Sequence, residues 1–451
     1  MKNNSDEIIK DGNNPSFFPK ITQNQPNLDD SKKNNIIASS ELKNSLTKPE
    51  FNKYTYKTIN MKIISIIIYF IVIIGFELLY RDYLFNKSVS LQEKIHLNPK
   101  SDLLLKIGKI ISFFAANMAA FIFVFLIFLF MPLNYSFLML QSIIYSAYFT
   151  NTMKMIYQSD RPNWQVNYLL RSCNNGYGNP SGHAFTSVNM YLCLAHILFK
   201  YFKIRYVLRI LIFIFCILIS ILIILSRVIL AAHSINQIIY GALLGIGVYY
   251  ILIHIIGYHN YTSIEFYQHI KKKRVKKTYY IFHSFLLFLT VFIYLFSKNK
   301  DTSEIEKRVF NGRRCPFQPE YKKFKNDGLF QALSITAMLG AQFGIDILFI
   351  ILKANDYVIN FSLIEWNKNK KITFIGLRVV VILFSGIGII FYFIVPGNVI
   401  LFFVFVFKSA MAFFLGMAGI YSLGIFLCIK LKIANKDIYK MDALHEITAE
   451  V

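Results

Sequence analysis

The chain has 451 residues, of which 55% are hydrophobic, and it carries a formal net charge of +24. A soluble protein of this length would expose too much apolar surface, so the composition excludes a soluble enzyme and indicates an integral membrane protein. The positive charge does not require a nucleic-acid partner, because basic loops also orient membrane helices. The five cysteines show no metal-binding or redox spacing.

The first segment, residues 1–57, is polar and lacks periodicity, so we expect a disordered cytoplasmic tail. After it we expect an all-α fold, a polytopic transmembrane helical bundle. Apolar runs of suitable length predict about ten spans. They lie near 62–80, 105–132, 135–153, 183–199, 206–226, 234–257, 279–297, 328–352, 373–395 and 398–430. We divide this part into a core (58–257), additional transmembrane helices (258–432) and a C-terminal tail (433–451).

The basic loops predict the orientation of these spans. Three basic segments fall on one side together with the N-terminal tail: 200–205, 271–277 and 430–440. That side should be cytoplasmic, because cytoplasmic loops carry an excess of Lys and Arg. The opposite side then holds 154–182 and 226–233. The loop 298–327 disagrees, because it is also basic but falls on the non-cytoplasmic side.

Three short motifs collect on the non-cytoplasmic side: "KMIYQSDRP" (154–162), "PSGH" (180–183) and "SRVILAAH" (226–233). They carry Lys154, Arg161, His183, Arg227 and His233. Three cations suit the outer oxygens of a phosphate group, and an arginine binds two oxygens at once. The backbone amides of Ser181 and Gly182 open a helix, and helix N-termini favour anions.

The two histidines then remain for chemistry: one can attack phosphorus and the other can protonate the leaving oxygen. The three motifs contain one carboxylate, Asp160, whereas two-metal phosphatases need several. We therefore predict a reaction that needs no metal and no cofactor. Taken singly, each residue also has a structural explanation, as an interfacial anchor, a snorkelling lysine or a helix cap.

The motifs Lys-x6-Arg-Pro, Pro-Ser-Gly-His and Ser-Arg-x5-His resemble the three signatures of the type 2 phosphatidic acid phosphatase superfamily, in the same order. The resemblance covers about 80 residues, 154–237. It implies a six-helix phosphatase core. It also implies that Lys154, Arg161 and Arg227 bind phosphate with Ser181 and Gly182, that His183 is the general acid, and that His233 becomes a phosphohistidine.

One position departs from most of the superfamily, because Gln237 stands where an aspartate usually orients the nucleophile. Glucose-6-phosphatases look similar to this chain here, with His-x3-Gln, and also in "RPNW" (161–164), "SCNNGYGNPSGHA" (172–184) and the spans after the third motif. A carboxylate from elsewhere is a second hypothesis for orienting His233. The candidates near the proposed face are Glu77, Asp82 and Asp160.

The leading hypothesis is therefore a membrane phosphomonoesterase of the glucose-6-phosphatase type, which acts on a soluble sugar phosphate in the lumen of the endoplasmic reticulum. A lipid phosphate or polyprenyl diphosphate phosphatase would share every catalytic residue, and a channel or transporter with a phosphate-binding vestibule is the non-enzymatic alternative. The expected partners are the substrate and membrane lipids, without nucleic acid. Trp164, Tyr168 and Tyr177 could stack on a sugar or lie at the interface, and Cys173 and Cys315 could form a disulfide.

Overall fold

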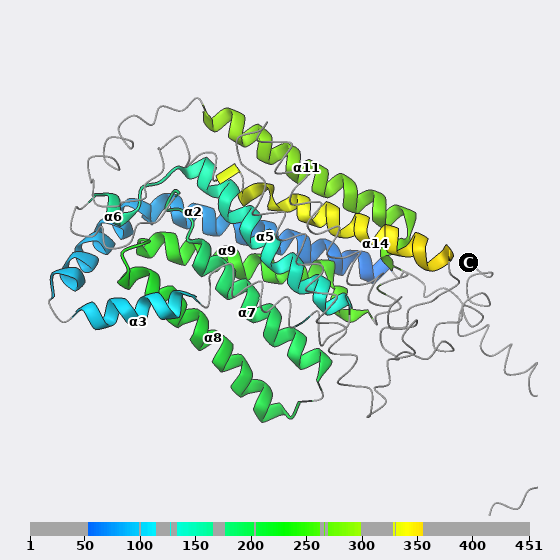
Figure 1. Cartoon of the computed structure of the whole chain (residues 1–451), viewed down its shortest axis with the longest axis horizontal. Helices are drawn as coiled ribbons and strands as arrows, with labels where there is room; N and C mark the ends of the chain where they lie inside the picture. The colour runs from blue at the N-terminus through cyan, green and yellow to red at the C-terminus, as the bar shows by residue number, and fades with distance from the viewer. Residues whose placement is uncertain are drawn as a thin grey trace, which may run out of the picture. The chain divides into compact units, whose positions relative to one another are not determined.

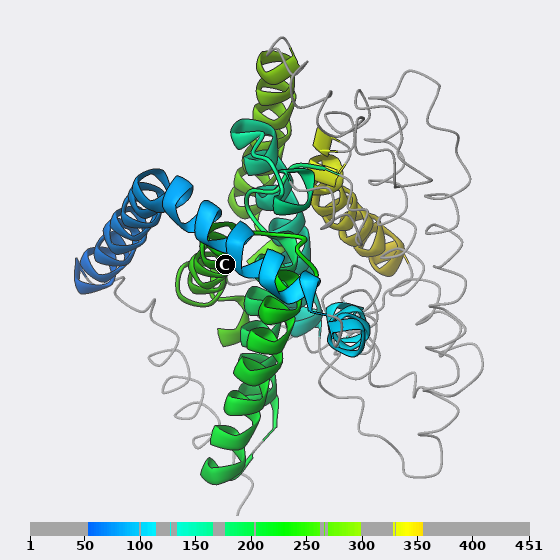
Figure 2. The ribbon, with the colours of Figure 1, turned by 90° about the vertical axis from the view of Figure 1, so that its left-hand side faces the viewer.

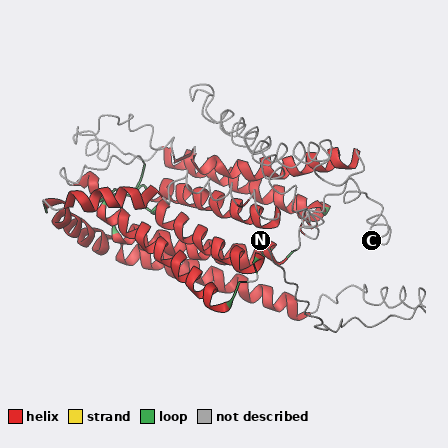
Figure 3. Cartoon of the chain, turned by 60° about the horizontal axis from the view of Figure 1, so that its bottom comes forward, coloured by secondary structure: helices red, strands yellow, loops and turns green. Residues whose placement is uncertain are grey.

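The computed structural model describes residues 53–98, 101–113, 127, 133–165, 176–202, 204–261, 266, 269–298, 328–329 and 331–354. Within these ranges the chain forms helices and loops and no strand (Figure 3). The all-helical prediction therefore holds for the described part of the chain.

The helices follow one another along the chain as shown in Figure 1. The longer ones are α2 (Lys53–Leu97), α3 (Ser101–Phe113), α5 (Leu133–Tyr157), α7 (Gly182–Tyr201), α8 (Tyr206–Ile229), α9 (Ile235–Tyr250), α11 (Lys273–Lys298) and α14 (Thr336–Ala354). The short ones are α6 (Pro162–Gln165), the π-helix η2 (Ile251–Ile256) and the 3-10 helices η3 (Tyr258–Asn260) and η4 (Leu333–Ile335). The chain divides into two compact units, Met1–Asn60 and Met61–Val451, and all elements after the start of α2 belong to the second.

Among the residues that the structure describes, four helices are long and apolar enough to cross a membrane: Asn60–Leu97, Tyr206–Ile229, Ile235–Ile256 and Lys273–Ser297. Their length and composition indicate a membrane protein. The expected spans at 135–153 and 183–199 form α5 and α7, but polar residues keep these helices outside that group. The expected spans at 373–395 and 398–430 lie outside the described residues, so the ten spans and the six-helix core remain predictions.

Helix α8 buries polar residues and exposes apolar ones, which is the opposite of a helix on the surface of a soluble protein. Its buried positions are mostly small or polar: Cys216, Ser220, Ile223, Ser226 and Arg227. Its large apolar side chains point outward, for example Phe213 and Phe215. A helix of this kind is stable when lipid covers its outer face, because lipid solvates apolar side chains and leaves polar groups to be satisfied inside the protein.

Helix α7 is the centre of the bundle, because it packs against α5, α8 and α9 (Figures 1 and 2). Two glycines let α9 approach it closely. A Cβ atom on Gly241 would lie 2.6 Å from the carbonyl oxygen of Ser181, and one on Gly245 would lie 2.7 Å from that of Phe185. Neither position has room for a side chain. This contact fixes the start of α9, and with it the loop before α9, against the first turn of α7.

Candidate active site

The structure brings together the side chains of the three motifs. Lys154 lies in the last turn of α5, Arg161 lies just before α6, His183 lies in the first turn of α7, and Arg227 lies in the last turn of α8. His233 lies in the loop between α8 and α9. Electrostatic interactions connect the His233 ring with the other four. Residues up to 79 positions apart in the sequence thus form one basic cluster.

Both nitrogens of the His233 ring have partners, and these partners determine where the proton lies. Nδ1 is 2.8 Å from the carbonyl oxygen of Gly178 and 3.3 Å from Oε1 of Gln237. Both oxygens only accept hydrogen bonds, so Nδ1 carries the proton and donates. Nε2 therefore keeps its lone pair, and it lies 3.2 Å from Nη1 of Arg161. This is the tautomer that an attacking imidazole requires.

The surroundings of His233 also keep it neutral. The side chain is buried, and burial is the main factor that lowers its pKa well below the usual value of 6.5. The positive charges of Arg161, Arg227 and Lys154 lower this pKa further. The ring is therefore unprotonated at Nε2 at neutral pH, which leaves the lone pair available to a nearby electrophile.

Arg161 holds the loops around this ring in place. Its Nε donates to the carbonyl oxygen of Gly176 at 2.7 Å, and its Nη2 donates to that of Tyr177 at 3.2 Å. Its Nη1 donates to the carbonyl oxygen of Ala232 at 2.8 Å, one residue before His233. One guanidinium group therefore joins the loop before α7 to the loop before α9, and it presents positive charge beside the Nε2 of His233.

The Gln237 side chain makes a set of hydrogen bonds that an aspartate at this position could not make. Its Oε1 accepts from the backbone N–H of Ser234 at 3.2 Å as well as from His233. Its Nε2 donates to the backbone carbonyl oxygen of Asp160 at 2.7 Å. Gln237 thus caps the first turn of α9 and ties the loop that carries His233 to the end of the first motif. An aspartate has no donor for the second of these tasks.

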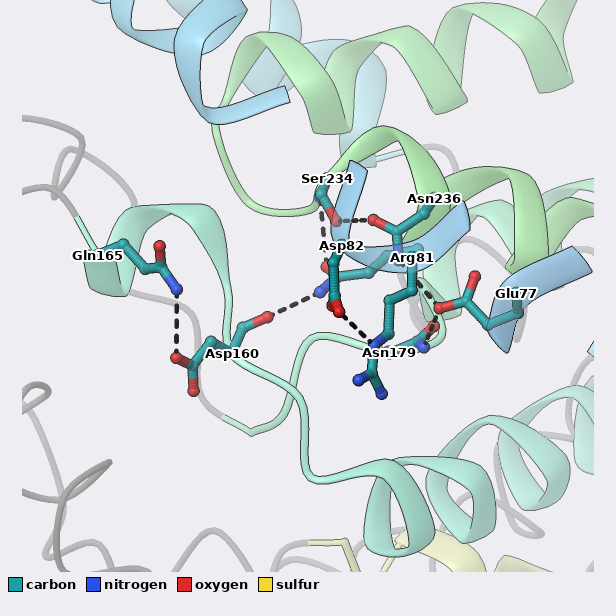
Figure 4. A network of polar contacts seen from close by, with 9 residues as sticks. Glu77, Arg81, Asp82, Asp160, Gln165, Asn179, Ser234 and Asn236 are labelled. Atoms are coloured by element: carbon teal, nitrogen blue, oxygen red, sulfur yellow. Dashed lines mark hydrogen bonds and ion pairs between the residues drawn. The ribbon is translucent and has the colours of Figure 1, made fainter. Parts of the chain in front are cut away.

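The three carboxylates proposed as alternatives have polar partners of their own, which Figure 4 shows. Glu77 accepts hydrogen bonds from two asparagines, Asp82 pairs with Arg81 at 3.2 Å and is largely exposed, and the carboxylate of Asp160 accepts from Gln165 at 3.4 Å. Within the described structure no carboxylate contacts the ring of His233. The geometry thus argues against direct orientation by any of the three, whereas the backbone carbonyl oxygen of Asp160 supports the site by accepting from Gln237.

The start of α7 differs in one detail from what the sequence indicates. The backbone N–H of Ser181 is not available to an anion, because it donates to the carbonyl oxygen of Gln237 at 2.9 Å. The hydroxyl of Ser181 is fully buried and has no hydrogen-bond partner in the described structure. A buried hydroxyl without a partner is costly, and a phosphate oxygen would satisfy it. At Gly182 space is limited, because a Cβ there would lie 3.1 Å from Cγ2 of Thr150 and that side chain would have to move slightly.

Two further contacts of the site could not be predicted from the sequence. Nη1 of Arg227 donates to Oγ of Ser112 on α3 at 2.6 Å, so α3 positions one of the three cations. The carbonyl oxygen of Gly178 is the nearest partner of Nδ1 of His233. Position 178 has no room for a side chain, because a Cβ there would lie 2.5 Å from the carbonyl oxygen of Asp160. The sequence signal for Gly178 is its place in a glycine- and asparagine-rich turn, whereas Ser112 is one of several polar residues in its helix and nothing in the sequence distinguishes it from the others.

The sequence also singles out three aromatic residues and two cysteines near the site. Trp164 and Tyr177 are both buried, so neither is a lipid-facing aromatic residue at the interface. Tyr168, Cys173 and Cys315 lie outside the described residues. Across the described ranges, no three His, Cys, Asp or Glu side chains are grouped so as to hold a metal ion.

The position of Gln237 gives a first testable prediction. Changing Gln237→Glu should lower the rate of catalysis by about tenfold, because it removes the donor to the Asp160 carbonyl and places an oxygen opposite it. The added negative charge should not compensate, because Gly178 already accepts the Nδ1 proton. The measurement is kcat/KM, with folded protein quantified by size-exclusion chromatography. Faster catalysis in this variant would show that the missing charge limits the enzyme.

Comparison with known families places the site in context. The family described as the PAP2 superfamily matches residues 135–261 of the chain. This range contains all three motifs, helices α7 to α9 and most of α5. Members of the superfamily are phosphatases, so the match supports a hydrolase of phosphoric monoesters in general. No curated protein and no solved structure matches the chain.

Proposed function

We propose that the protein is a metal-independent membrane phosphomonoesterase that acts through a phosphohistidine at His233. The observation that carries this proposal is the state of the His233 ring. Its Nδ1 is fixed by the Gly178 carbonyl oxygen, its pKa is lowered by burial, and its Nε2 lies beside the Arg161 guanidinium. A neutral imidazole with an unprotonated Nε2 amid positive charge suits attack on a phosphate group.

The proposed reaction proceeds in two steps. In the first, Nε2 of His233 forms a bond to phosphorus while the bond from phosphorus to the leaving oxygen breaks. His183, held as the imidazolium by the negative charge of the bound phosphate, gives that oxygen a proton and becomes neutral. In the second, His183 takes a proton from water, the water oxygen bonds to phosphorus, and the bond from phosphorus to Nε2 breaks. Inorganic phosphate then leaves, and both histidines return to their starting states.

The basic side chains supply the charge stabilisation. Lys154, Arg161 and Arg227 would bind the three outer oxygens, where negative charge lies in the ground state and the transition state. The buried hydroxyl of Ser181 adds a neutral donor. In this arrangement the protein's own cations do the work that metal ions do in two-metal phosphatases.

For the substrate, we propose a soluble sugar phosphate that is hydrolysed on the non-cytoplasmic side, in the endoplasmic reticulum. The support is the similarity to glucose-6-phosphatases around residues 161–164 and 172–184 and at Gln237. The buried Trp164, whose backbone N–H donates to the Arg161 carbonyl oxygen, would lie next to the phosphate-binding arginine. A lipid phosphatase would use the same catalytic residues, so substrate and chemistry need separate tests.

A parallel assay tests the chemistry and the substrate together. The purified protein is given glucose 6-phosphate and phosphatidic acid separately, each with and without excess EDTA, and released phosphate is measured. We expect release from the sugar phosphate that is unchanged by the chelator. Release from the lipid alone would keep the mechanism and contradict the substrate. Activity lost in chelator and restored by a divalent cation would contradict metal independence, and release from neither substrate would favour a phosphate-binding channel or transporter.

A further inference from the structure

Helix α2 carries a row of buried polar side chains that the proposed reaction does not yet use. Glu77, Ser88 and Gln92 are each 0% exposed, although α2 is one of the four helices apolar enough to cross a membrane. The spacings of 11 and 4 residues correspond to about three turns and one turn, so the three side chains share one face of the helix. Burying a carboxylate and an amide in this environment is costly, and their partners give the reason.

The Glu77 carboxylate joins the loop before α7 to the first turn of α9 (Figure 4). Its Oε1 accepts from Nδ2 of Asn179 at 2.7 Å and from Nδ2 of Asn236 at 2.9 Å. Asn179 directly follows Gly178, whose carbonyl oxygen fixes the His233 ring. Asn236 lies three residues after His233, in the first turn of α9. A single oxygen atom therefore sets the distance between the nucleophile and the group that orients it.

The other two side chains hold the nucleophile loop by its backbone. Nε2 of Gln92 donates to the carbonyl oxygen of His233 at 2.8 Å, and Oγ of Ser88 accepts from the backbone N–H of Ile235 at 2.7 Å. These contacts hold the chain at His233 and two residues after it. Together with Glu77 they attach residues 233–236 to α2 at three points, within one compact unit of the chain.

We propose that α2 is a positioning element of the active site, and that Glu77 is the positioning residue that fixes His233 relative to the Gly178–Asn179 loop. This inference rests on the proposed phosphatase function. Helix α2 lies outside residues 135–261, which the superfamily matches, so the family match alone does not assign it this role. Glu77 acts through the two asparagines rather than by contact with the nucleophilic ring.

The test compares Glu77→Ala with Glu77→Gln in a single-turnover experiment, with enzyme in excess over labelled glucose 6-phosphate. The rate constant reports the position of the nucleophile, whereas the amplitude reports the fraction of correctly folded protein. Glu77→Ala should lower the rate constant by about 10²-fold, because small misplacements of reacting groups cost that much. Glu77→Gln keeps a carbonyl oxygen that can accept both bonds, and its rate constant should stay within about threefold of wild type.

Two further variants make the test specific. Glu93→Ala is the matched control, because Glu93 is a partly exposed carboxylate on the same helix, and its rate constant should not change. Asn179→Ala removes only one of the two bonds to Glu77 and keeps the test valid if Glu77→Ala does not fold. It should slow the reaction by about tenfold. It should cause no additional loss when combined with Glu77→Ala, because both changes break the same link.

The outcomes separate the two proposals. A lower amplitude with an unchanged rate constant in Glu77→Ala or Asn179→Ala would show a structural role only and would overturn the positioning role. A slow Glu77→Gln variant would also overturn it, because the two hydrogen bonds would then not explain the effect. A wild-type protein that hydrolyses neither substrate of the parallel assay would overturn the phosphatase function and this inference with it.

Discussion

Changing His233→Ala should lower kcat for phosphate release by about 10⁴-fold or more, because the variant has no atom that can form the bond to phosphorus. The folded protein should be recovered in a yield close to that of wild type, since the backbone of this loop stays tied to Gln92 through the His233 carbonyl oxygen. The measurement is the initial rate with glucose 6-phosphate, normalised to monodisperse protein from size-exclusion chromatography.

The matched control for this variant is His196→Ala. His196 is also a histidine of the bundle, but it lies toward the far end of α7, where its ring packs against that of His259 with 4.3 Å between the ring centroids. Removing this ring changes packing but touches no motif residue, so kcat should remain close to that of wild type. Equal activity of wild type and His233→Ala would contradict a nucleophilic role for His233.

The second large effect is expected for His183→Ala, and it should depend on the leaving group. A sugar alkoxide needs a proton as it leaves, so hydrolysis of glucose 6-phosphate should fall by about 10³-fold when the general acid is removed. The 4-nitrophenolate ion leaves without a proton, so its release in the first turnover should fall by less than about tenfold. Stopped-flow absorbance measures this first turnover.

The comparison between the two substrates separates catalysis from binding. If His183 only helps to bind the phosphate group, both substrates should lose activity equally, because they present the same phosphate to the site. His183 lies in the first turn of α7, close enough to Arg227, Lys154 and Arg161 for electrostatic interaction. Equal losses would therefore assign His183 to phosphate binding and would leave the general acid to be found elsewhere.

The residues that form the basic cluster could be selected from the sequence, because charged groups at the ends of apolar segments are conspicuous. Lys154, Arg227 and His183 stand out for this reason, and the structure places them within electrostatic range of His233. The extent of α8 was also close to the prediction, with a helix at Tyr206–Ile229 where an apolar run covers 206–226. Hydropathy identifies such a helix because nearly all of its outer face is apolar.

The prediction was less complete where contacts depend on the backbone or on distant parts of the chain. The Gly178 carbonyl oxygen orients His233, but a backbone acceptor has no residue signature. Gln92 lies 141 residues from His233, and only the folded chain shows that they meet. The apolar run at 62–80 identifies the most apolar part of α2 but not its continuation to Leu97, where polar residues on one face are buried against the loop that carries His233.

Glu77 shows most clearly why a sequence can indicate a residue without its role. An isolated carboxylate in an apolar segment signals a function, and the sequence led to the hypothesis that it orients His233 directly. The structure instead places it between Asn179 and Asn236. Which partners a buried carboxylate finds depends on the register and rotation of α2 against the loops, and the local sequence of α2 does not determine either of them.

The central claim is that His233 forms a covalent bond to phosphorus, and rapid chemical quenching tests it most directly. Wild-type protein is mixed with a ³²P-labelled substrate, quenched in alkali within the first turnover and digested. A bond between phosphorus and histidine survives alkali and is broken by acid. The account predicts an alkali-stable, acid-labile label on the peptide that contains His233, and no label in His233→Ala. Turnover of the substrate without any labelled peptide, or with the label on another residue, would contradict it.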